Sequence, residues 1–210
     1  MGALSVDGGL LTFQKQLKEG SRQRLLTAAA SAFCAQGYHP VSVEDIASAA
    51  GVSRMTFYRH FSGKAAVAAE LFRRSGEEAT PRFLAIGQRE FHDRQAVVRW
   101  ISDLFEADRE KRRLLRVFLQ VVVEDAAFTE SGHDFINSMI AGLGHSIPAF
   151  ALDREDPGDR RAWIQAWLVL YEIMDQSNHG AQSSGVAADP LIIEVLADRF
   201  VDFVRRGDTA

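Results

Sequence analysis

Apolar residues recur at spacings of three and four along nearly the whole chain, and no stretch alternates in the manner of a strand. The chain is therefore predicted to be all-α. In the first clear amphipathic stretch, 21–36, Leu25, Leu26 and Phe33 share one face, and Gly37 then ends the pattern as a helix C-cap would. A helix is expected over this stretch.

Two short helices are predicted next, on either side of Gly51. Ser42, followed three residues later by Asp45, is typical of a capping box and opens a helix that runs to residue 50. Ser53 is placed to cap a second helix that ends near Phe61. Two short helices joined by a tight glycine turn have the proportions of a helix-turn-helix, whose second helix lies in the DNA major groove.

The remainder is predicted to form longer helices. Three pairs, Thr80-Pro81, Asp156-Pro157 and Asp189-Pro190, each place an N-cap residue before a proline, which is tolerated at the first helical position. The expected helices cover 63–79, 81–91, 94–108, 111–125, 128–149, 158–179 and 190–206.

The second short helix is predicted to have two different faces. At ~100° per residue, Phe57 and Phe61 lie within about 40° of each other and are expected to point inward. Met55, Thr56, Tyr58 and Arg59 point away from that core. A guanidinium, a hydroxyl, a phenol and a thioether suit base edges, thymine methyl groups and phosphates. Solvated surface charge is the plainer explanation for any single arginine, and only the motif favours DNA.

Charge is distributed unevenly. The whole chain has a net charge of −4. Residues 1–75 hold nine Lys or Arg against five Asp or Glu, a net charge of +4. The remaining residues hold 15 Lys or Arg against 23 Asp or Glu, a net charge of −8. This asymmetry suggests a polyanion partner for the first part. Residues 1–20 contain Gly-Gly and are expected to be a flexible arm. The predicted domains are therefore 1–20, 21–74 and 75–210.

A group of residues carries a family resemblance. The chain reads Gly37-Tyr38, then Val41-Ser42-Val43-Glu44-Asp45-Ile46-Ala47, Gly51-Val52-Ser53, Thr56-Phe57-Tyr58, His60-Phe61 and Lys64. This pattern resembles the amino-terminal DNA-binding signature of the TetR/AcrR repressors, over about Arg22 to Phe72. The resemblance implies a three-helix DNA-binding domain followed by a larger helical domain for ligand binding and dimerisation. It also implies a homodimer on a palindromic operator, released when a small molecule binds.

The resemblance also implies roles for individual residues. Ser42 and Lys64 would be phosphate anchors, and Tyr58 and His60 would contact phosphates beside the reading face. Arg54, Met55 and Thr56 would read bases, whereas Arg59 stands where the family varies freely. The predicted DNA-binding residues are therefore Ser42, Arg54, Met55, Thr56, Tyr58, Arg59, His60 and Lys64.

The last two predicted helices, 158–179 and 190–206, are apolar on nearly every side. A helix that is apolar all round must be covered all round, and a second copy of the chain could cover one face. The family resemblance likewise makes these helices the dimer interface. Bulky residues could line a cavity for a small, largely apolar or aromatic effector, with Asn178 as a polar contact: Trp100, Phe105, Phe118, Phe135, Met139, Trp167, Tyr171 and Met174. Ordinary core packing is the alternative for each of them.

Other functions are disfavoured by what the sequence lacks. It has no H-E-x-x-H, G-x-S-x-G or phosphate-loop motif, and His60 has no ligand partner at helical spacing, so no enzyme, cofactor or metal site is expected. No apolar run is long enough for a membrane span, and the first 20 residues do not read as a signal peptide, so a cytoplasmic protein is expected. A transcriptional activator of the same fold stays open, as does a helical protein-interaction module.

Overall fold

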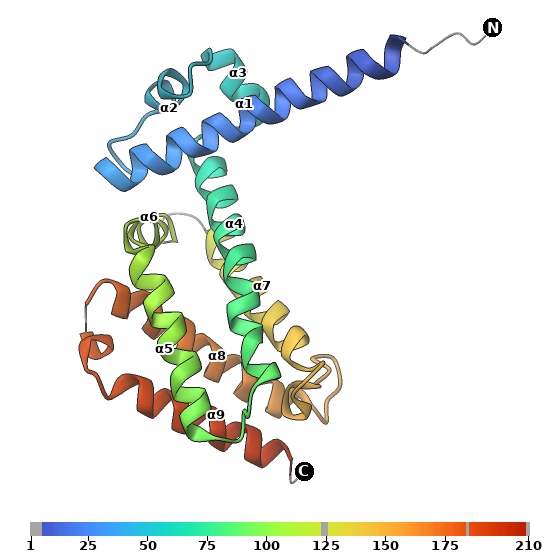
Figure 1. The fold of residues 1–210 in the computed structure, drawn as a ribbon, viewed down its shortest axis with the longest axis vertical. Helices are drawn as coiled ribbons and strands as arrows, with labels where there is room; N and C mark the ends of the chain where they lie inside the picture. The colour runs from blue at the N-terminus through green and yellow to red at the C-terminus, as the bar shows by residue number, and fades with distance from the viewer. Residues whose placement is uncertain (1–5, 123–125, 184, 209–210) are drawn as a thin grey trace, which may run out of the picture. The chain divides into compact units, whose positions relative to one another are not determined.

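The computed structural model describes residues 6–122, 126–183 and 185–208, and all regular structure within these ranges is helical (Figure 1). This confirms the predicted fold class. The α-helices are α1 (Val6–Gln36), α2 (Val43–Ala49), α3 (Arg54–His60), α4 (Lys64–Leu84), α5 (Arg94–Glu110), α6 (Arg112–Val122), α7 (Ala126–Leu143), α8 (Arg160–Ala181) and α9 (Ile192–Gly207). Three short 3-10 helices are η1 (Ala85–Gln88), η2 (Pro148–Phe150) and η3 (Gly185–Ala188).

The chain divides into two compact units. The first contains the residues up to Phe72 together with Val117–Val121, and the second contains Arg73–Arg116 and Val122–Ala210. The sequence predicts a boundary at residue 74, and nothing in it indicates that part of α6 groups with the first unit. Each unit is described by itself below.

Helix α1 begins much earlier than predicted. It spans 31 residues from Val6, so residues 6–20, expected to be an arm without regular structure, are helical. The reason lies in local propensity, because 14–19 reads Gln-Lys-Gln-Leu-Lys-Glu, a run of good helix formers. A single Gly20 costs only about 1 kcal/mol in a helix interior, which is too little to break such a run.

Helix α4 also runs past a predicted break. The pair Thr80-Pro81 was expected to start a new helix, but Pro81 lies inside α4, which continues to Leu84. Thr80 does not act as a cap, since its Oγ1 donates to the carbonyl oxygen of Gly76, at 2.9 Å. Proline removes one N–H donor here, and the helix changes to the tighter η1 a turn later.

The first unit has its own hydrophobic core. Helices α2 and α3 both pack against α1 (Figure 1). Leu25 and Phe33 of α1, Ile46 of α2 and Phe57 of α3 are all at most 1% exposed. The apolar stripe predicted for 21–36 is therefore the surface on which the two short helices are mounted.

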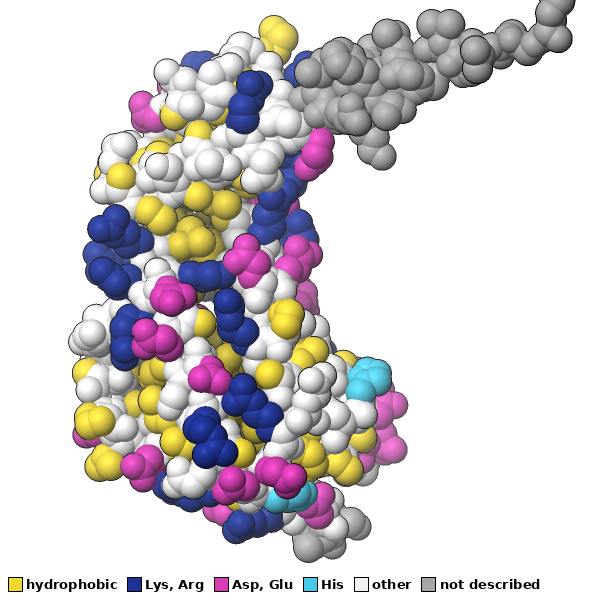
Figure 2. Space-filling view, in the orientation of Figure 1, with side chains coloured by type: hydrophobic (Ala, Val, Ile, Leu, Met, Phe, Trp, Pro, Cys, Tyr) yellow, Lys and Arg dark blue, Asp and Glu magenta, His cyan; other side chains and the backbone are white. Residues whose placement is uncertain are grey.

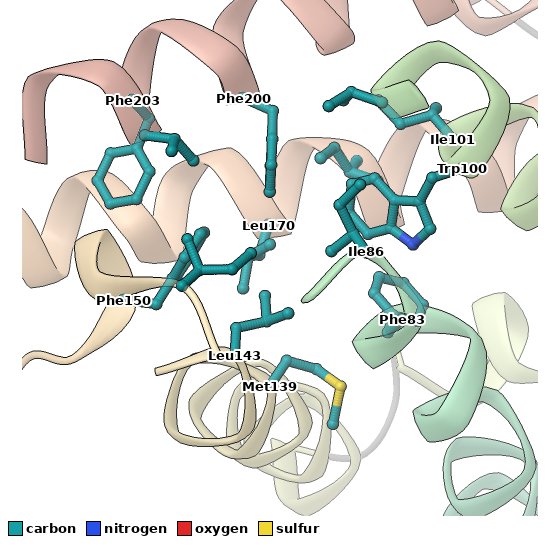
Figure 3. Packing of buried hydrophobic residues seen from close by; sticks show 14 of the residues in the cluster. Phe83, Ile86, Trp100, Ile101, Met139, Leu143, Phe150, Leu170, Phe200 and Phe203 are labelled. Atoms are coloured by element: carbon teal, nitrogen blue, oxygen red, sulfur yellow. The ribbon is translucent and has the colours of Figure 1, made fainter. Parts of the chain in front are cut away.

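The second unit is built around α5, α8 and α9, which contact one another extensively. Trp100 of α5 lies 5.1 Å from Phe200 of α9 between ring centroids, and Phe150 of η2 lies 4.9 Å from Phe203 (Figure 3). The indole N–H of Trp100 donates to the carbonyl oxygen of Arg82 at 3.0 Å, so its one polar atom is satisfied. The core is thus closely packed by aromatic side chains.

Candidate nucleic-acid interface

The entry to α2 is fixed by a complete capping box. The backbone N–H of Asp45 donates to Ser42 Oγ at 3.1 Å, and both the N–H and the hydroxyl of Ser42 donate to Asp45 Oδ2, at 2.9 and 2.6 Å. The side-chain hydrogen bond from Ser42, followed by the backbone one, lowers the pKa of the Asp45 carboxyl from its usual value. The sequence prediction of this cap is confirmed. However, the single hydroxyl hydrogen of Ser42 is committed to Asp45, so a direct bond to phosphate would require it to rotate away.

The turn between α2 and α3 is a Schellman motif. Gly51 has a φ of +65°, the left-handed conformation that favours glycine. The N–H of Gly51 donates to Ser48 O and the N–H of Val52 donates to Ala47 O, both at 3.0 Å. Two of the last carbonyls of α2 are therefore satisfied, and the chain direction into α3 is set by hydrogen bonds.

Helix α3 begins after Ser53, whose Oγ accepts the backbone N–H of Thr56 at 3.1 Å. Phe57 is fully buried and Phe61 is 5% exposed, so the predicted inward face is confirmed. On the other face, Met55 is 83% exposed and Tyr58 is 49% exposed. Large side chains that remain in solvent on a well-packed helix are available to a partner.

The predicted reading residues differ in how firmly they are held. Arg54 Nη1 lies 2.6 Å from Glu44 Oε1 of α2, and its guanidinium carbon lies 5.9 Å from the centre of the Tyr58 ring. Contact with Tyr58 and then the charge of Glu44 raise the pKa of Arg54, which is cationic in any case. Arg59 is exposed and forms no ion pair with the residues that the structure describes.

Two other predicted contacts are less accessible. The Thr56 hydroxyl lies 3.1 Å from Ser53 Oγ, so it already has a hydrogen-bond partner. His60 is partly buried, with its ring centroid 6.5 Å from that of Phe61. The most exposed part of α3 is therefore formed by Arg54, Met55, Tyr58 and Arg59.

Lys64, predicted as a phosphate anchor, binds carbonyl groups of the protein's own backbone. Its Nζ donates to the carbonyl oxygens of Tyr38, His39 and Val41, at 3.0, 3.0 and 3.2 Å, and lies 4.4 Å from the centre of the Tyr38 ring. An ammonium group has three donors, and all three are used. Sequence reasoning missed this arrangement because the loop before α2 and the start of α4 are more than 20 residues apart.

A second side chain binds the same loop. The backbone N–H of Tyr38 donates to Gln120 Oε1, at 3.0 Å, within the first unit. The sequence does not predict this bond, because Gln120 lies 82 residues from Tyr38 along the chain. Lys64 and Gln120 together satisfy the backbone groups of the loop that leads into the cap of α2.

The predicted effector residues are dispersed through the packing. Trp100, Phe105 and Met139 belong to the buried core of the second unit. Phe118 falls in the first unit, where its ring meets that of Phe72 edge-on at 5.3 Å, so it does not join the others. The remaining residues are partly buried or exposed: Phe135, Trp167, Tyr171, Met174 and Asn178. The first three residues thus form part of the core, and an effector role for the nine residues stays a prediction.

Trp167 forms the best-defined aromatic cluster among these residues. Its ring stacks on that of Tyr171 at 5.0 Å and 10°, and the ring of His133 meets it edge-on at 5.3 Å. Tyr171 is 37% exposed, so this cluster reaches the surface. Trp167 itself is partly buried, whereas Trp100 is 1% exposed.

Helices α8 and α9 expose an apolar surface. Ile164, Leu168 and Tyr171 lie at i, i+4 and i+7 on α8, and Leu191 and Val195 occupy the start of α9. An open groove of about 480 Å³ follows these helices and includes Leu168, Glu172 and Arg199. Glu172 and Arg199 form an ion pair between the two helices. Figure 2 shows how hydrophobic side chains lie between basic and acidic ones on one face of the molecule.

No group of three or more metal-ligating side chains occurs within the ranges that the structure describes. Across those ranges, every helix is either too short or too polar to cross a bilayer.

Residues 25–71 match the sequence profile described as "Bacterial regulatory proteins, tetR family". This match contains the capping box, the Schellman turn and α3. This part of the chain is therefore similar to the tetR-family regulators that the profile describes. Members of this family are regulators rather than enzymes, in agreement with the prediction that this chain is not an enzyme.

Two curated relatives match parts of the chain. The uncharacterised HTH-type transcriptional regulator YdgC of Bacillus subtilis is 45% identical over 51 residues, which is 24% of this chain and 26% of that protein. The HTH-type transcriptional activator FasR of Mycolicibacterium smegmatis is 29% identical over 132 residues, which is 57% of this chain and 60% of that protein. The chain thus aligns with less than two thirds of either relative.

Several solved structures share the fold over most of the chain. A regulator from Streptomyces coelicolor has a TM-score of 0.63 at 23% identity, covering 85% of this chain and 97% of its own. GusR from Salmonella enterica has a TM-score of 0.62 at 19% identity, covering 88% and 95%. A regulator from Mesorhizobium loti has a TM-score of 0.60 at 16% identity, covering 90% and 96%. At these identities the likeness establishes the fold.

Proposed function

We propose that this protein is a ligand-responsive transcriptional regulator that binds a palindromic operator as a homodimer in the cytoplasm. The observation that carries the proposal is the exposed face of α3, where Arg54, Met55, Tyr58 and Arg59 stand in solvent on a helix anchored by two phenylalanines. Cationic and aromatic groups on one rigid face suit the major groove, where arginine reads guanine and apolar groups contact thymine methyls.

The residues of this face have different proposed roles. Arg54 and Met55 contact base edges, with Thr56 beside them once its hydroxyl turns from Ser53. Tyr58 and His60 contact phosphates, and the Arg59 guanidinium contacts a further phosphate of the DNA backbone. Phosphate contacts fix the register of a protein on DNA, whereas base contacts supply the specificity.

Ser42 and Lys64 are proposed to act mainly by positioning. Ser42 caps α2, and Lys64 binds the loop that precedes this cap, so both fix the helix on which α3 is mounted. A direct bond from Lys64 to phosphate, expected from the family resemblance, would have to replace at least one of its present bonds.

The apolar stripe on α8 and α9 supports the homodimer. Ile164, Leu168 and Val195 are about half exposed, although single domains seldom leave such a stripe open. A twofold axis through this surface would pair two copies of α3, matching the symmetry of a palindrome. Interfaces of this apolar kind are typical of permanent homodimers.

An effector that alters DNA binding is the remaining part of the proposal. The stacked rings of Trp167 and Tyr171, of which Tyr171 is 37% exposed, are the proposed contact for a small, largely apolar or aromatic molecule. Intrinsic fluorescence of Trp167, with Trp167→Phe as the reference, would report binding in a screen of aromatic compounds. Compounds that quench the wild-type protein and not the variant support this location.

Repression is the proposed outcome, and activation is the second candidate. The relative FasR is described as an activator, and this observation favours keeping both. A promoter fused to a reporter distinguishes them, since deletion of a repressor raises expression and deletion of an activator lowers it.

Direct binding tests the core of the proposal. Full-length protein is titrated onto a labelled duplex from its own promoter region at moderate salt, with a scrambled duplex as the control. We expect tighter binding to the promoter, and affinity that falls steeply as salt is raised. Equal, weak binding to both duplexes would overturn the proposal.

A further inference from the structure

Glu44 of α2 places a carboxylate beside the first residue of the reading helix. Its Oε1 lies 2.6 Å from Arg54 Nη1, and the two side chains are 51% and 61% exposed. The Tyr58 ring lies 5.9 Å from the same guanidinium. Arg54 therefore has an acidic partner and an aromatic partner at once, and both hold it on the exposed surface of α3.

This ion pair contributes little to the stability of the fold. Exposed salt bridges contribute little to stability, because water screens them and ordering two long side chains costs entropy. The start of α2 is already capped by Ser42 and Asp45, so Glu44 is not needed there. The main physical effect of the pair is to restrict the directions in which the Arg54 side chain can point.

A carboxylate on a surface that faces DNA has a cost. It repels phosphates on any sequence and offsets one of the cations beside it, which weakens non-specific binding. An arginine without an acidic partner is also free to reach the nearest phosphate, a contact that carries no sequence information. A restrained guanidinium loses less conformational freedom when it makes the two parallel hydrogen bonds that guanine accepts.

We propose that Glu44 is a specificity-determining residue, which holds Arg54 for base contact and lowers affinity for DNA of the wrong sequence. The inference rests on the proposed function, because it presumes that α3 reads DNA. Glu44 acts through Arg54 and is a positioning residue. The ligand that this pair selects is a guanine-containing base step within the operator half-site.

The test is a double-mutant cycle on full-length protein with wild type, Glu44→Gln, Arg54→Ala and the double variant. Each is titrated by fluorescence anisotropy onto two duplexes, the preferred sequence and a scrambled one of equal composition, at three salt concentrations. Glutamine keeps the size and removes the charge. We expect Glu44→Gln to bind the scrambled duplex about three- to tenfold more tightly, and to discriminate at least about fivefold less well.

The Arg54→Ala background separates positioning from other roles. In that background, Glu44→Gln should change the ratio of the two affinities by less than about twofold, because Arg54, the residue that Glu44 positions, is absent. An unchanged ratio for Glu44→Gln in the wild-type background would overturn the inference and leave the proposed function standing. An equal loss of discrimination between the two duplexes in both backgrounds would also overturn the inference, because Glu44 would then contact DNA itself. Wild-type protein that prefers no sequence would overturn the proposed function together with this inference.

Thermal unfolding of the four proteins checks the alternative of a purely structural role. We expect the same unfolding temperature for wild type and Glu44→Gln, because the pair is exposed. A marked loss of stability, with a proportional loss of affinity for both duplexes, would assign Glu44 to the fold and contradict the inference.

Discussion

Helices α3 and α8 both hold large side chains in solvent, but the chemistry of the two surfaces differs. On α3, the apolar Met55 stands among arginines and a tyrosine, while on α8, Ile164 and Leu168 form an apolar stripe. A mixed cationic and aromatic face suits a polyanion that remains hydrated, whereas an apolar stripe is stabilised only by another apolar surface. Exposure alone therefore does not identify a partner, and the accompanying charge does.

The largest expected effect is on stability, and it differs between the inner and the outer face of α3. Phe57→Ala removes a fully buried ring and should lower the free energy of unfolding by about 3–5 kcal/mol. Met55→Ala on the same helix, at a side chain that is 83% exposed, should change it by less than about 0.5 kcal/mol. Urea unfolding measures both. Similar losses in the two variants would contradict the assignment of inner and outer faces.

Breaking the apolar stripe is the next largest effect. Leu168→Glu should raise the dissociation constant of the proposed dimer by about a hundredfold, since burying a charged carboxylate in place of an apolar side chain is costly. Analytical ultracentrifugation over a concentration series measures the shift toward monomer. Gln95→Glu adds the same charge at an exposed site on α5 and should leave the dimer intact. Dimers of equal strength in the two variants would mean that the copies associate through another surface.

Lys64→Met tests whether the first unit holds its reading helix by backbone contacts. The variant keeps an apolar stem but loses three hydrogen bonds to carbonyl groups, so unfolding should become easier by about 1–3 kcal/mol. DNA affinity should fall while its dependence on salt stays nearly unchanged. Arg59→Ala is the matched comparison, because losing a direct phosphate contact lowers the salt slope by about one. The same slope change for Lys64→Met would show a direct phosphate bond instead.

The smallest effect concerns a polar pair within the second unit. Ser177 Oγ donates to Asp108 Oδ2 at 2.5 Å, and burial raises the pKa of the Asp108 carboxyl above its usual 3.8, although this hydrogen bond opposes the rise. The folded protein thus binds a proton that the unfolded chain releases, so stability falls as pH rises from 3.8 through the raised pKa. Asp108→Asn lacks this fall.

Urea unfolding of wild type and Asp108→Asn between acidic and neutral pH measures the difference. The variant should gain stability relative to wild type as pH rises through that window. Ser177→Ala should steepen the wild-type fall, since it removes the hydrogen bond that favours the charged carboxylate. A difference that is independent of pH would mean that burial of Asp108 is not penalised.

The sequence predicted α3 well because its determinants are local. Ser42 and Asp45 are three residues apart, and Phe57 and Phe61 are one helical turn apart. Position 51 is a glycine, the residue type that most readily adopts the left-handed conformation of the turn. Such signals specify helix starts, turns and faces without any knowledge of tertiary contacts. They also correctly indicated which side of α3 is exposed.

Contacts between distant segments were not predictable in the same way. The bonds from Lys64 to the loop before α2, and the pair of Glu44 with Arg54, depend on how helices cross. In the second unit, a tryptophan at helical spacing serves equally well in a core or in a cavity. Trp100 proved to be core and Trp167 reaches the surface, a difference that only packing decides.

Selection of DNA from a random duplex library by the full-length protein tests the central claim most directly. We predict a palindromic sequence with two half-sites separated by at least one helical turn, as a dimer with two copies of α3 requires. Arg54→Ala should lose the preference at one symmetric pair of positions and keep the rest. No enriched sequence, or an identical sequence selected by a variant with Arg54, Met55 and Thr56 all replaced by alanine, would contradict the account.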